Sequence, residues 1–362
     1  MTNLKELVKN AVGNELLINE ESEIRSHICC SPSTPDIDGI DKKWKVFLAG
    51  PIRGAESWQH EVPNVDNVIF FSPRRNSYSN FSYEEQIKWE KKWLNLCDVI
   101  IMWIPEEVEH VEGRSYAQTT RTEFGEYLAL GKKIIFGCYD QFPGKRYFKT
   151  KLEEYGVDSN IHRSLDSCIN ALEEYIKSCE ETPQTWFTSD THFGDSRAWE
   201  LSRRPFKSVE AMDLYMMRKW NDNVKPCDTI YHLGDFGKNE DEYVPLLNGK
   251  KILVYGNYER DGKYQAIDKL FDKTYKQSII VTINDKKYCL CHEPLRGRSV
   301  MNKHKELYGC IFGHIHGRSK VKQFRAVDVG VDSWYYKPMS IDDCNFFINA
   351  VDKGYYDGNV WC

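Results

Sequence analysis

Five short apolar segments recur through the second half of this chain, and each is followed by a polar side chain of a type that binds metal ions. Apolar runs of this length predict buried β-strands. The polar residues that follow them are Asp190 and His192, Asp235, Asn257, His292, and finally His314 and His316. Because ligands gather outside the carboxyl ends of the strands in a layered α/β domain, we expect these seven side chains to converge. The pattern therefore predicts an α/β fold with one polar centre.

The last of these segments holds two histidines one residue apart, in the sequence IFGHIHGR of residues 311–318. On an extended segment alternate side chains point the same way, so His314 and His316 can serve one centre. Gly313 and Gly317 allow the backbone to approach whatever the imidazoles bind. A His-x-His pair alone also fits a solvated strand face. The upstream residues favour the metal site.

Seven nitrogen and oxygen ligands suit two divalent ions, with the carboxylate of Asp235 as the shared ligand. Imidazole with carboxylate suits Mn, Fe, Zn, Co or Ni better than Ca or Mg. Two such ions roughly 3.5–4 Å apart acidify a bridging water and neutralise a phosphoryl group. The ligand set thus predicts a dinuclear hydrolytic centre.

The blocks Asp-Thr-His, Gly-Asp, Gly-Asn, His and Gly-His-Ile-His, in this order between Thr185 and Ala350, resemble the calcineurin-like metallophosphoesterases. The resemblance implies a four-layer α/β/β/α domain. It implies one metal held by Asp190, His192, Asp235 and His316, and another held by Asp235, Asn257, His292 and His314. Residues 327–334 look like the closing strand of small bacterial and phage members.

The chain departs from that family after Asn257, where the usual histidine is replaced by Tyr258. A phenol with an unperturbed pKa of ~10 donates a hydrogen bond but is a weak acid near neutral pH. We therefore expect leaving groups that need little protonation, as in cyclic phosphates, phosphoanhydrides or activated diesters. In the alternative, Tyr258 only packs, and Glu259 or a metal-bound water supplies the proton.

Arg203 and Arg204 are candidate phosphate anchors, because a guanidinium fork matches phosphate oxygens. A solvated helix end explains them equally well.

The first half of the chain alternates strand and helix patterns, which predicts a Rossmann-like parallel sheet flanked by helices. The expected strands are 45–52, 68–71, 98–105 and 133–137, and the expected helices are 83–96, 122–131 and 164–178. We assign residues 1–43 to an N-terminal extension and linker, 44–180 to the first domain and 183–362 to the second. On the helix at 83–96, Trp89 and Trp93 are expected in the core, and Glu84, Glu85 and Glu90 on a solvated face.

Candidate site residues of the first domain lie near the predicted strand ends. Gly50 and Pro51 end the first strand, where a nucleotide could approach the backbone, and Arg74 and Arg75 follow the second strand. Glu123 is expected to open a helix, whose dipole would keep the carboxylate ionised. An ionised carboxylate there could attack an anomeric carbon.

The motifs AGPI (49–52), PRR (73–75), QIKWE (86–90) and TEFGEY (122–127) resemble the nucleoside 2-deoxyribosyltransferase-like family over about Lys45 to Tyr175. The resemblance implies Glu123 as the nucleophile and Asp98 as a supporting residue. The family's Asp-Ser-Gly-Thr turn is absent, because residues 115–120 read SYAQTT. The activity of the first domain therefore stays open between glycosyl transfer, hydrolysis of an N-glycosidic bond, and binding alone.

Composition limits the partners of the 362-residue chain. Its net charge of -5 argues against a general polyanion-binding surface, and no apolar run is long enough to span a membrane. The N-terminus lacks a signal-peptide core, and the 12 scattered cysteines are expected to be reduced and mostly buried, so we expect a cytoplasmic protein.

These patterns together lead to one hypothesis: the protein is a bifunctional hydrolase that acts on a small nucleotide-type substrate. A homo-oligomer is compatible with this hypothesis. The alternatives are a phosphodiesterase whose first domain only binds nucleotides, an RNA-end or cyclic phosphodiesterase, and a non-enzymatic interaction protein. The last leaves the complete ligand set unexplained.

Overall fold

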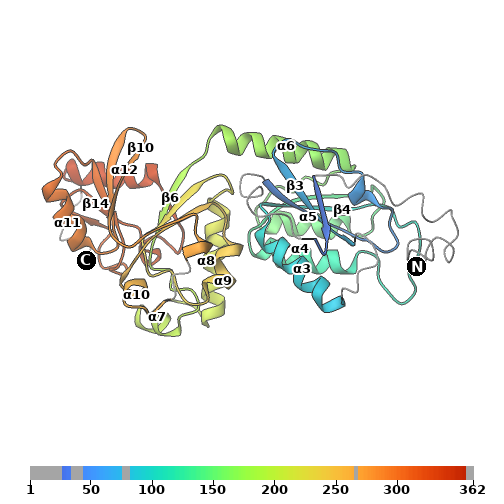
Figure 1. The fold of residues 1–362 in the computed structure, drawn as a ribbon, viewed down its shortest axis with the longest axis horizontal. Helices are drawn as coiled ribbons and strands as arrows, with labels where there is room; N and C mark the ends of the chain where they lie inside the picture. Colours follow the sequence, from blue (N-terminus) through green and yellow to red (C-terminus); the bar gives the residue numbers. More distant parts are fainter. Residues whose placement is uncertain (1–26, 34–43, 76–81, 265–267, 356–362) are drawn as a thin grey trace, which may run out of the picture.

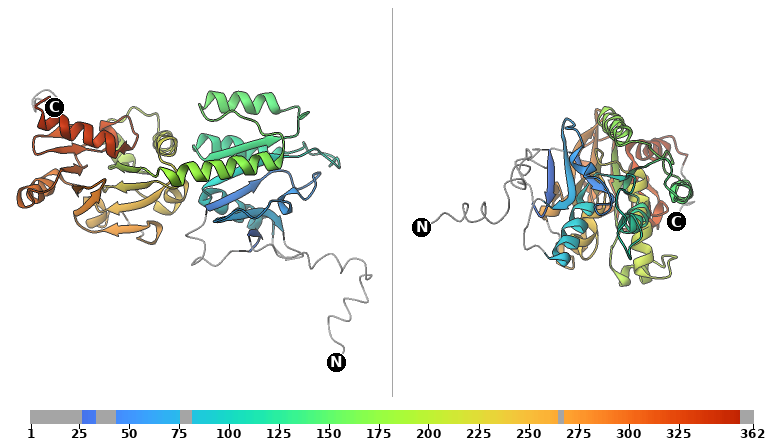
Figure 2. Two further views of the ribbon diagram at one scale, coloured as in Figure 1. Left: turned by 90° about the horizontal axis from the view of Figure 1, so that it is seen from above. Right: turned by 90° about the vertical axis from the view of Figure 1, so that its right-hand side faces the viewer.

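The computed structural model describes residues 27–33, 44–75, 82–264 and 268–355. Two α/β units follow one another along the chain, and helix α6 (Leu165–Glu181) leads from the first to the second (Figure 1). Figure 2 shows α6 lying along the first sheet before the chain enters the second unit.

All strands of the first unit are parallel, in the order β1-β3-β2-β4-β5. They are β1 (Ile28–Ser31), β2 (Trp44–Ala49), β3 (Val68–Arg75), β4 (Val99–Ile104) and β5 (Lys133–Cys138). Every residue of β4 is buried, as expected for a central strand covered on both faces. The predicted Rossmann-like sheet is confirmed.

Helices cover both faces of this sheet. One face packs against α3 (Tyr83–Leu96), α4 (Gln118–Ala129) and α5 (Lys145–Glu154), and the other packs against α6 and the short helix at Trp58–His60. Helix α3 spans the predicted residues, and a capping box at Ser82 and Glu85 sets its first turn. Trp89 and Trp93 are buried, as predicted.

Strand β1 lies within the stretch assigned from sequence to the N-terminal extension. It pairs with β3, which places Ile28–Ser31 in the first sheet. Its four residues give too short a pattern to separate a strand from a linker. The other residues of the extension, 1–26 and 34–43, lie outside the described residues.

The second unit contains two five-stranded sheets, in the orders β15-β6-β7-β8-β9 and β10-β11-β12-β14-β13. The first comprises β6 (Thr185–Thr188), β7 (Thr229–His232), β8 (Lys250–Val254), β9 (Lys273–Tyr275) and β15 (Met339–Ser340). The second comprises β10 (Ile279–Ile283), β11 (Lys286–Leu290), β12 (Gly309–Phe312), β13 (Val321–Lys322) and β14 (Ala326–Asp328).

Side chains alternate across these sheets and define four layers. On β11, Tyr288 and Leu290 enter the core between the sheets, whereas Cys289 faces α11 (Pro294–Lys303). The outer face of the other sheet packs against α8 (Val209–Asn223). The predicted α/β/β/α arrangement is confirmed. The remaining helices are α7 (Ser196–Leu201), α9 (Glu240–Tyr243), α10 (Asn257–Arg260) and α12 (Ile341–Asp352).

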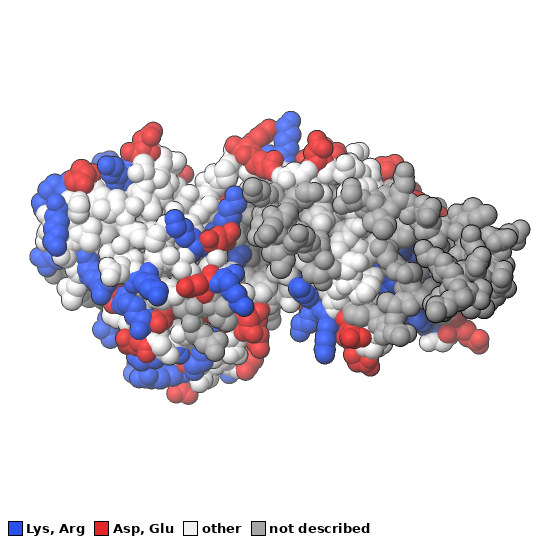
Figure 3. All heavy atoms as spheres, viewed as in Figure 1, with Lys and Arg blue, Asp and Glu red and all other residues white. Residues whose placement is uncertain are grey.

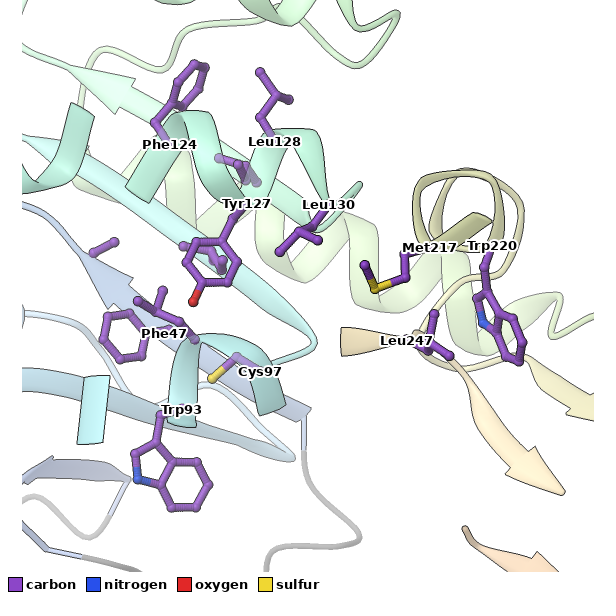
Figure 4. Close-up of a cluster of buried hydrophobic side chains, with 14 of the residues drawn as sticks. Phe47, Trp93, Cys97, Phe124, Tyr127, Leu128, Leu130, Met217, Trp220 and Leu247 are labelled. Carbon is purple, nitrogen blue, oxygen red and sulfur yellow. The ribbon is translucent and has the colours of Figure 1, made fainter. Parts of the chain in front are cut away.

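Helix α8 also joins the two units. Leu128 and Leu130 at the end of α4 belong to the same buried cluster as Met217 and Trp220 of α8 (Figure 4). Arg218 donates hydrogen bonds to the carbonyl of Leu128 at 2.6 Å and to that of Tyr155 at 2.8 Å. Asn221 donates to the carbonyl of Leu130 at 2.7 Å. Side chains of α8 thus bind carbonyls at the C-terminal end of α4.

The surface carries both signs of charge. On the face shown in Figure 3, basic and acidic side chains of the described residues are interspersed over the second unit. Among the described residues, no helix combines the length and the apolarity that crossing a membrane requires.

Candidate active sites

The structure brings together the predicted metal ligands at the carboxyl ends of the strands. Two triads form, Asp190 with His192 and His316, and Asp235 with His292 and His314, and the ligand atoms within each triad lie within 4.8 Å of one another. The Oδ2 atom of Asp235 lies 3.7 Å from Nε2 of His192 and 3.4 Å from Nε2 of His292. Asp235 therefore occupies the position of a ligand shared by both triads.

Asn257, the first residue of α10, lies beside the second triad. Its Oδ1 atom lies 2.9 Å from Nε2 of His292 and 3.1 Å from Nδ1 of His314. An amide oxygen and two imidazole nitrogens thus face one point beside Asp235.

Two buried ligand atoms favour metal binding at this centre. Oδ1 of Asp190 and Nε2 of His192 have no hydrogen-bond partner among the described residues. A buried polar atom without a partner costs about 1–3 kcal/mol. A divalent ion held between these atoms would satisfy both, so the residues present fit a metal site.

Most of the ligands have an unusual backbone conformation. Asp190, His192, Asp235 and His316 have φ angles of 59°, 51°, 57° and 47°, in the left-handed region that side chains other than glycine rarely adopt. Such strain persists only where surrounding contacts impose it. Here the amide of Asp190 donates to the carbonyl of Gly234 at 3.0 Å, and that of His192 donates to the carbonyl of Asp235 at 3.1 Å.

Hydrogen bonds to Nδ1 orient two of the imidazoles. Nδ1 of His292 lies 2.7 Å from the carbonyl oxygen of Leu233. Nδ1 of His192 lies 2.5 Å from the hydroxyl of Tyr264, which donates in turn to Asp195 at 2.8 Å. Each bond turns Nε2 of the imidazole towards the other predicted ligands, where it could bind a metal ion. Nothing in the sequence around Tyr264 indicates this role.

Asp332 orients a third imidazole. Its Oδ2 atom accepts a hydrogen bond from Nδ1 of His316 at 2.8 Å, and its carboxylate pairs with Arg204 at 2.8 and 3.0 Å. Burial opposes ionisation of Asp332, but the bond from His316 and the charge of Arg204 lower its pKa to about 2. Asp332 lies in the stretch recognised as a closing strand, but its role there was not predicted.

The prediction that Arg204 anchors phosphate is not supported. Besides pairing with Asp332, its guanidinium donates to the carbonyls of Thr191 at 2.7 Å and of Asp190 at 2.5 Å. It is 4 % exposed, so its donors hold the ligand loop rather than face a substrate. Arg203 is exposed and has a φ of 51°. It stays a candidate anchor.

Tyr258 lies at the metal centre, half-buried. Its ring meets that of His192 edge to face, with centroids 5.1 Å apart, and its amide donates to Oδ1 of Asp235 at 3.0 Å. Glu259, the alternative proton donor, is buried, and its carboxylate accepts from the amides of Asp235, Phe236 and Gly256 at 2.9, 2.8 and 2.7 Å. Glu259 therefore fixes the ligand loop, and the structure does not support it as the proton donor.

The first unit contains a cavity of about 960 Å³ at the carboxyl edge of its sheet. Five predicted site residues line it: Gly50, Pro51, Arg74, Arg75 and Glu123. A Cβ atom on Gly50 would lie 2.3 Å from the carbonyl oxygen of Trp103 and 2.6 Å from the ring of Trp58. Only glycine fits this wall of the cavity.

Hydrogen bonds to neighbouring residues hold the two arginines at the cavity wall. Arg74 donates to Oε1 of Gln59 at 2.6 Å and to the carbonyl of Glu56 at 2.7 Å. Arg75 donates to Oε1 of Gln86 at 3.2 Å. Both guanidinium groups contribute positive charge to the cavity wall.

The expectation for Glu123 was wrong in one respect. Helix α4 begins at Gln118, so Glu123 lies in its second turn rather than at its start. Burial, together with the nearby charges of Glu90 and Glu126, raises the pKa of Glu123 to about 8. This raised pKa runs against the expectation that the helix dipole keeps the carboxylate ionised.

Glu90 is a cavity residue that the sequence analysis assigned to a solvated face. Its Oε1 atom accepts a hydrogen bond from the buried amide of Gln86 at 2.7 Å. Gln86 is fixed by the carbonyl of Pro73 at 2.9 Å and the hydroxyl of Ser31 at 2.7 Å. Burial raises the pKa of Glu90 also. Glu84 and Glu85 are exposed, as predicted, whereas Glu90 lies four residues after Gln86 and therefore on the buried face of the helix.

Asp98 is not brought together with Glu123. It precedes β4, at the amino edge of the parallel sheet, opposite to the edge that carries the cavity. Its Oδ2 atom accepts from the amide of Lys45 at 2.8 Å, and its own amide donates to the carbonyl of Lys45 at 2.8 Å. Asp98 therefore ties β4 to β2, and a direct role at the cavity is not supported.

Comparison with known families agrees with this division of the chain. Residues 43–142 match the model described as nucleoside 2-deoxyribosyltransferase like, and residues 185–337 match the calcineurin-like phosphoesterase superfamily domain. The chain thus combines a nucleoside 2-deoxyribosyltransferase-like domain with a calcineurin-like phosphoesterase domain, as its motifs predicted.

Individual relatives match parts of the chain. An uncharacterised protein of Methanocaldococcus jannaschii is 26% identical over 183 residues, which are 47% of this chain and 92% of that protein. The gene 66 protein of Mycobacterium phage D29 is 23% identical over 47% of this chain and 98% of its own length. That of Mycobacterium phage L5 is 32% identical over 21% of this chain and 39% of its own length.

Two solved structures are also similar to parts of the chain. A protein of unknown function from Aquifex aeolicus shares 26% identity over 46% of this chain and 99% of its own, with a TM-score of 0.40. A Streptococcus pneumoniae protein described as a predicted phosphoesterase shares 16% identity over 42% of this chain and 72% of its own, with a TM-score of 0.23.

Replacing Asp332 by asparagine tests its role at the metal centre. The asparagine side chain keeps an oxygen that accepts hydrogen bonds, but it lacks the negative charge that holds His316 and Arg204. We therefore expect the affinity for manganese to fall by about 10–100-fold. Isothermal titration of the metal-free protein measures this change. Asp342→Asn, at an exposed position of α12, is the control. Unchanged affinity in Asp332→Asn would show that Asp332 does not support the metal site.

Proposed function

We propose that the protein is a bifunctional hydrolase of small nucleotide-type substrates. The second domain hydrolyses a phosphoester at a centre of two divalent ions, and the first domain cleaves or transfers an N-glycosidic bond in its cavity. The convergence of seven ligands, with Asp235 between the two triads, carries the phosphoesterase part. The cavity with its carboxyl pair supports the second activity.

At the metal centre, Asp190, His192, Asp235 and His316 would hold one ion, and Asp235, Asn257, His292 and His314 the other. Mn, Fe, Zn, Co or Ni suits this set. When bound, such ions neutralise the phosphoryl group and acidify a water molecule. Residues of the chain orient the ligands: Asp332 and Tyr264 fix two imidazoles, and Glu259 fixes the loop of Asp235.

Tyr258 would face the leaving group. Its phenol can donate a hydrogen bond, but a group of this type is a weaker acid near neutral pH than the histidine usual at this position. This favours cyclic phosphates, phosphoanhydrides and activated diesters over simple alkyl phosphomonoesters.

In the cavity, Glu90 and Glu123 form a pair of carboxyl groups. Two neighbouring carboxylates resist ionising together, so the pair tends to hold one proton. The ionised member can attack the anomeric carbon, and the protonated member can give its proton to the departing base. The likeness to deoxyribosyltransferases assigns the nucleophile role to Glu123. Arg74 and Arg75 suit an anionic group of the substrate.

A second candidate function keeps the phosphoesterase and limits the first domain to nucleotide binding. The sequence SYAQTT at 115–120, which lacks the family's acidic residue, favours it. An RNA-end or cyclic phosphodiesterase fits the same metal centre, and salt-dependent binding to RNA would favour that reading.

Two variants separate the proposed activities. With nucleotides, cyclic nucleotides and dinucleotides as substrates, Asp235→Asn should lower phosphate-ester cleavage by more than about 100-fold and leave free-base release unchanged. Glu123→Gln should lower base release by about 100-fold or more and leave ester cleavage unchanged. Mass spectrometry follows both products, with the exposed Glu84→Gln as control. If wild type releases no base from any substrate, the first domain only binds.

The pH dependence of base release follows from Glu123. The acidic groups near it are Glu90 on α3 and Glu126 on α4, and Arg74 and Arg75 face the cavity from β3. Since its pKa is about 8, Glu123 is protonated at neutral pH and gains the negative charge that nucleophilic attack requires as the pH rises through that value. Base release should therefore rise towards pH 8, as initial rates would measure. A rate that falls steadily as the pH rises from 6 to 8 would contradict Glu123 as the nucleophile.

A further inference from the structure

A third group of potential metal ligands lies outside both triads and consists of three cysteines. Cys289 belongs to β11, Cys291 follows β11 directly, and Cys310 belongs to β12. Their Sγ atoms all lie within 4.8 Å of one another, and those of Cys291 and Cys310 are 3.7 Å apart. All three residues are at most 1 % exposed. We call them the thiol triad.

The spacing of the thiol triad fits a single ion. Zinc binds thiolate sulfur at about 2.3 Å, which places sulfurs around one ion roughly 3.8–4.0 Å apart. The 3.7 Å between Cys291 and Cys310 already agrees with that spacing, and the widest separation needs to close by less than about 1 Å. Side-chain rotation alone can supply such a shift.

Helix α11 leaves room for these sulfurs at one position. A Cβ atom on Gly297 would lie 2.5 Å from Sγ of Cys310 and 2.9 Å from Sγ of Cys291. The backbone of α11 therefore packs directly on two sulfurs, and any larger residue would push into the triad.

The surroundings of the thiol triad select the class of ion. The buried apolar neighbours are Met301, Leu307, Phe312 and Ala326, and Sγ of Cys291 donates to the carbonyl of Glu293 at 3.4 Å. Soft sulfur ligands favour thiophilic ions such as zinc and monovalent copper over magnesium, calcium or manganese. The site thus differs in chemistry from the two triads of imidazole and carboxylate.

We propose that the thiol triad binds one thiophilic ion of the zinc class, separate from the two ions of the phosphoesterase centre. On binding, three S–H bonds break, three metal–sulfur bonds form, and up to three protons pass to solvent. Cys289 and Cys310 face each other in the parallel register of β11 and β12. These strands lead directly to His292 and His314, so the ion would hold two ligands of one metal position in register.

Cadmium, a spectroscopic probe for thiolate zinc sites, tests this inference on the full-length protein already saturated with manganese. One equivalent of cadmium should produce the ultraviolet thiolate-to-metal absorption in wild type. The band should be lost in Cys289→Ser and in Cys310→Ser and kept in Cys344→Ser, a buried cysteine of α12. No band in wild type, or an unchanged band in both triad variants, would show that the thiols pack only as small apolar side chains.

A measurement on wild type decides the case if the serine variants do not fold. Zinc-edge X-ray absorption of the full-length protein with three equivalents of zinc, enough for both positions of the phosphoesterase centre and for the thiol triad, should show sulfur neighbours at about 2.3 Å besides nitrogen and oxygen. A spectrum without sulfur neighbours would overturn the proposal. Neither result depends on hydrolytic activity, so failure here leaves the proposed function standing.

Discussion

The buried carboxylate of Glu259 holds the loop on which the metal centre depends. Its two oxygens accept hydrogen bonds from the amides of Asp235, Phe236 and Gly256, which join the ends of β7 and β8. Asp235 keeps its left-handed backbone within this network and thereby reaches both triads. Hydrogen bonds to a buried carboxylate are worth more than neutral ones, about 1.5–3 kcal/mol each. These hydrogen bonds therefore place Asp235 between the two triads.

Helix α8 contacts segments of both candidate sites. Near its start, Asp213 accepts a hydrogen bond from the amide of Gly194, in the loop after His192. Near its end, Arg218 and Asn221 bind carbonyls at the end of α4, the helix that carries Glu123. Rigid helices are one route by which contacts extend between distant sites. The metal centre and the cavity thus share a packed support, while their chemistry comes from different residues.

Sequence reasoning succeeded where a local pattern carries the information. Buried parallel strands read as continuous apolar runs, and ordered blocks at strand ends predicted the residues that the structure brings together in the two triads. It failed where the decisive contact is distant in sequence. Arg204 looked like a phosphate anchor because its partner Asp332 lies 128 residues away. Glu90 was missed for another reason: it was grouped with the exposed Glu84 and Glu85, although its place four residues after Gln86 puts it on the buried face of α3. Asp98 was assigned by likeness to the family, although its place before β4 already puts it at the amino edge of the sheet, away from the cavity.

The central claim is that Asp235 joins two metal positions in one phosphoesterase centre. Anomalous diffraction from crystals soaked in manganese measures this directly. The account predicts two manganese peaks about 3.5–4 Å apart, with the carboxylate of Asp235 within bonding distance of both. A single peak, or two peaks that do not share Asp235, would contradict it.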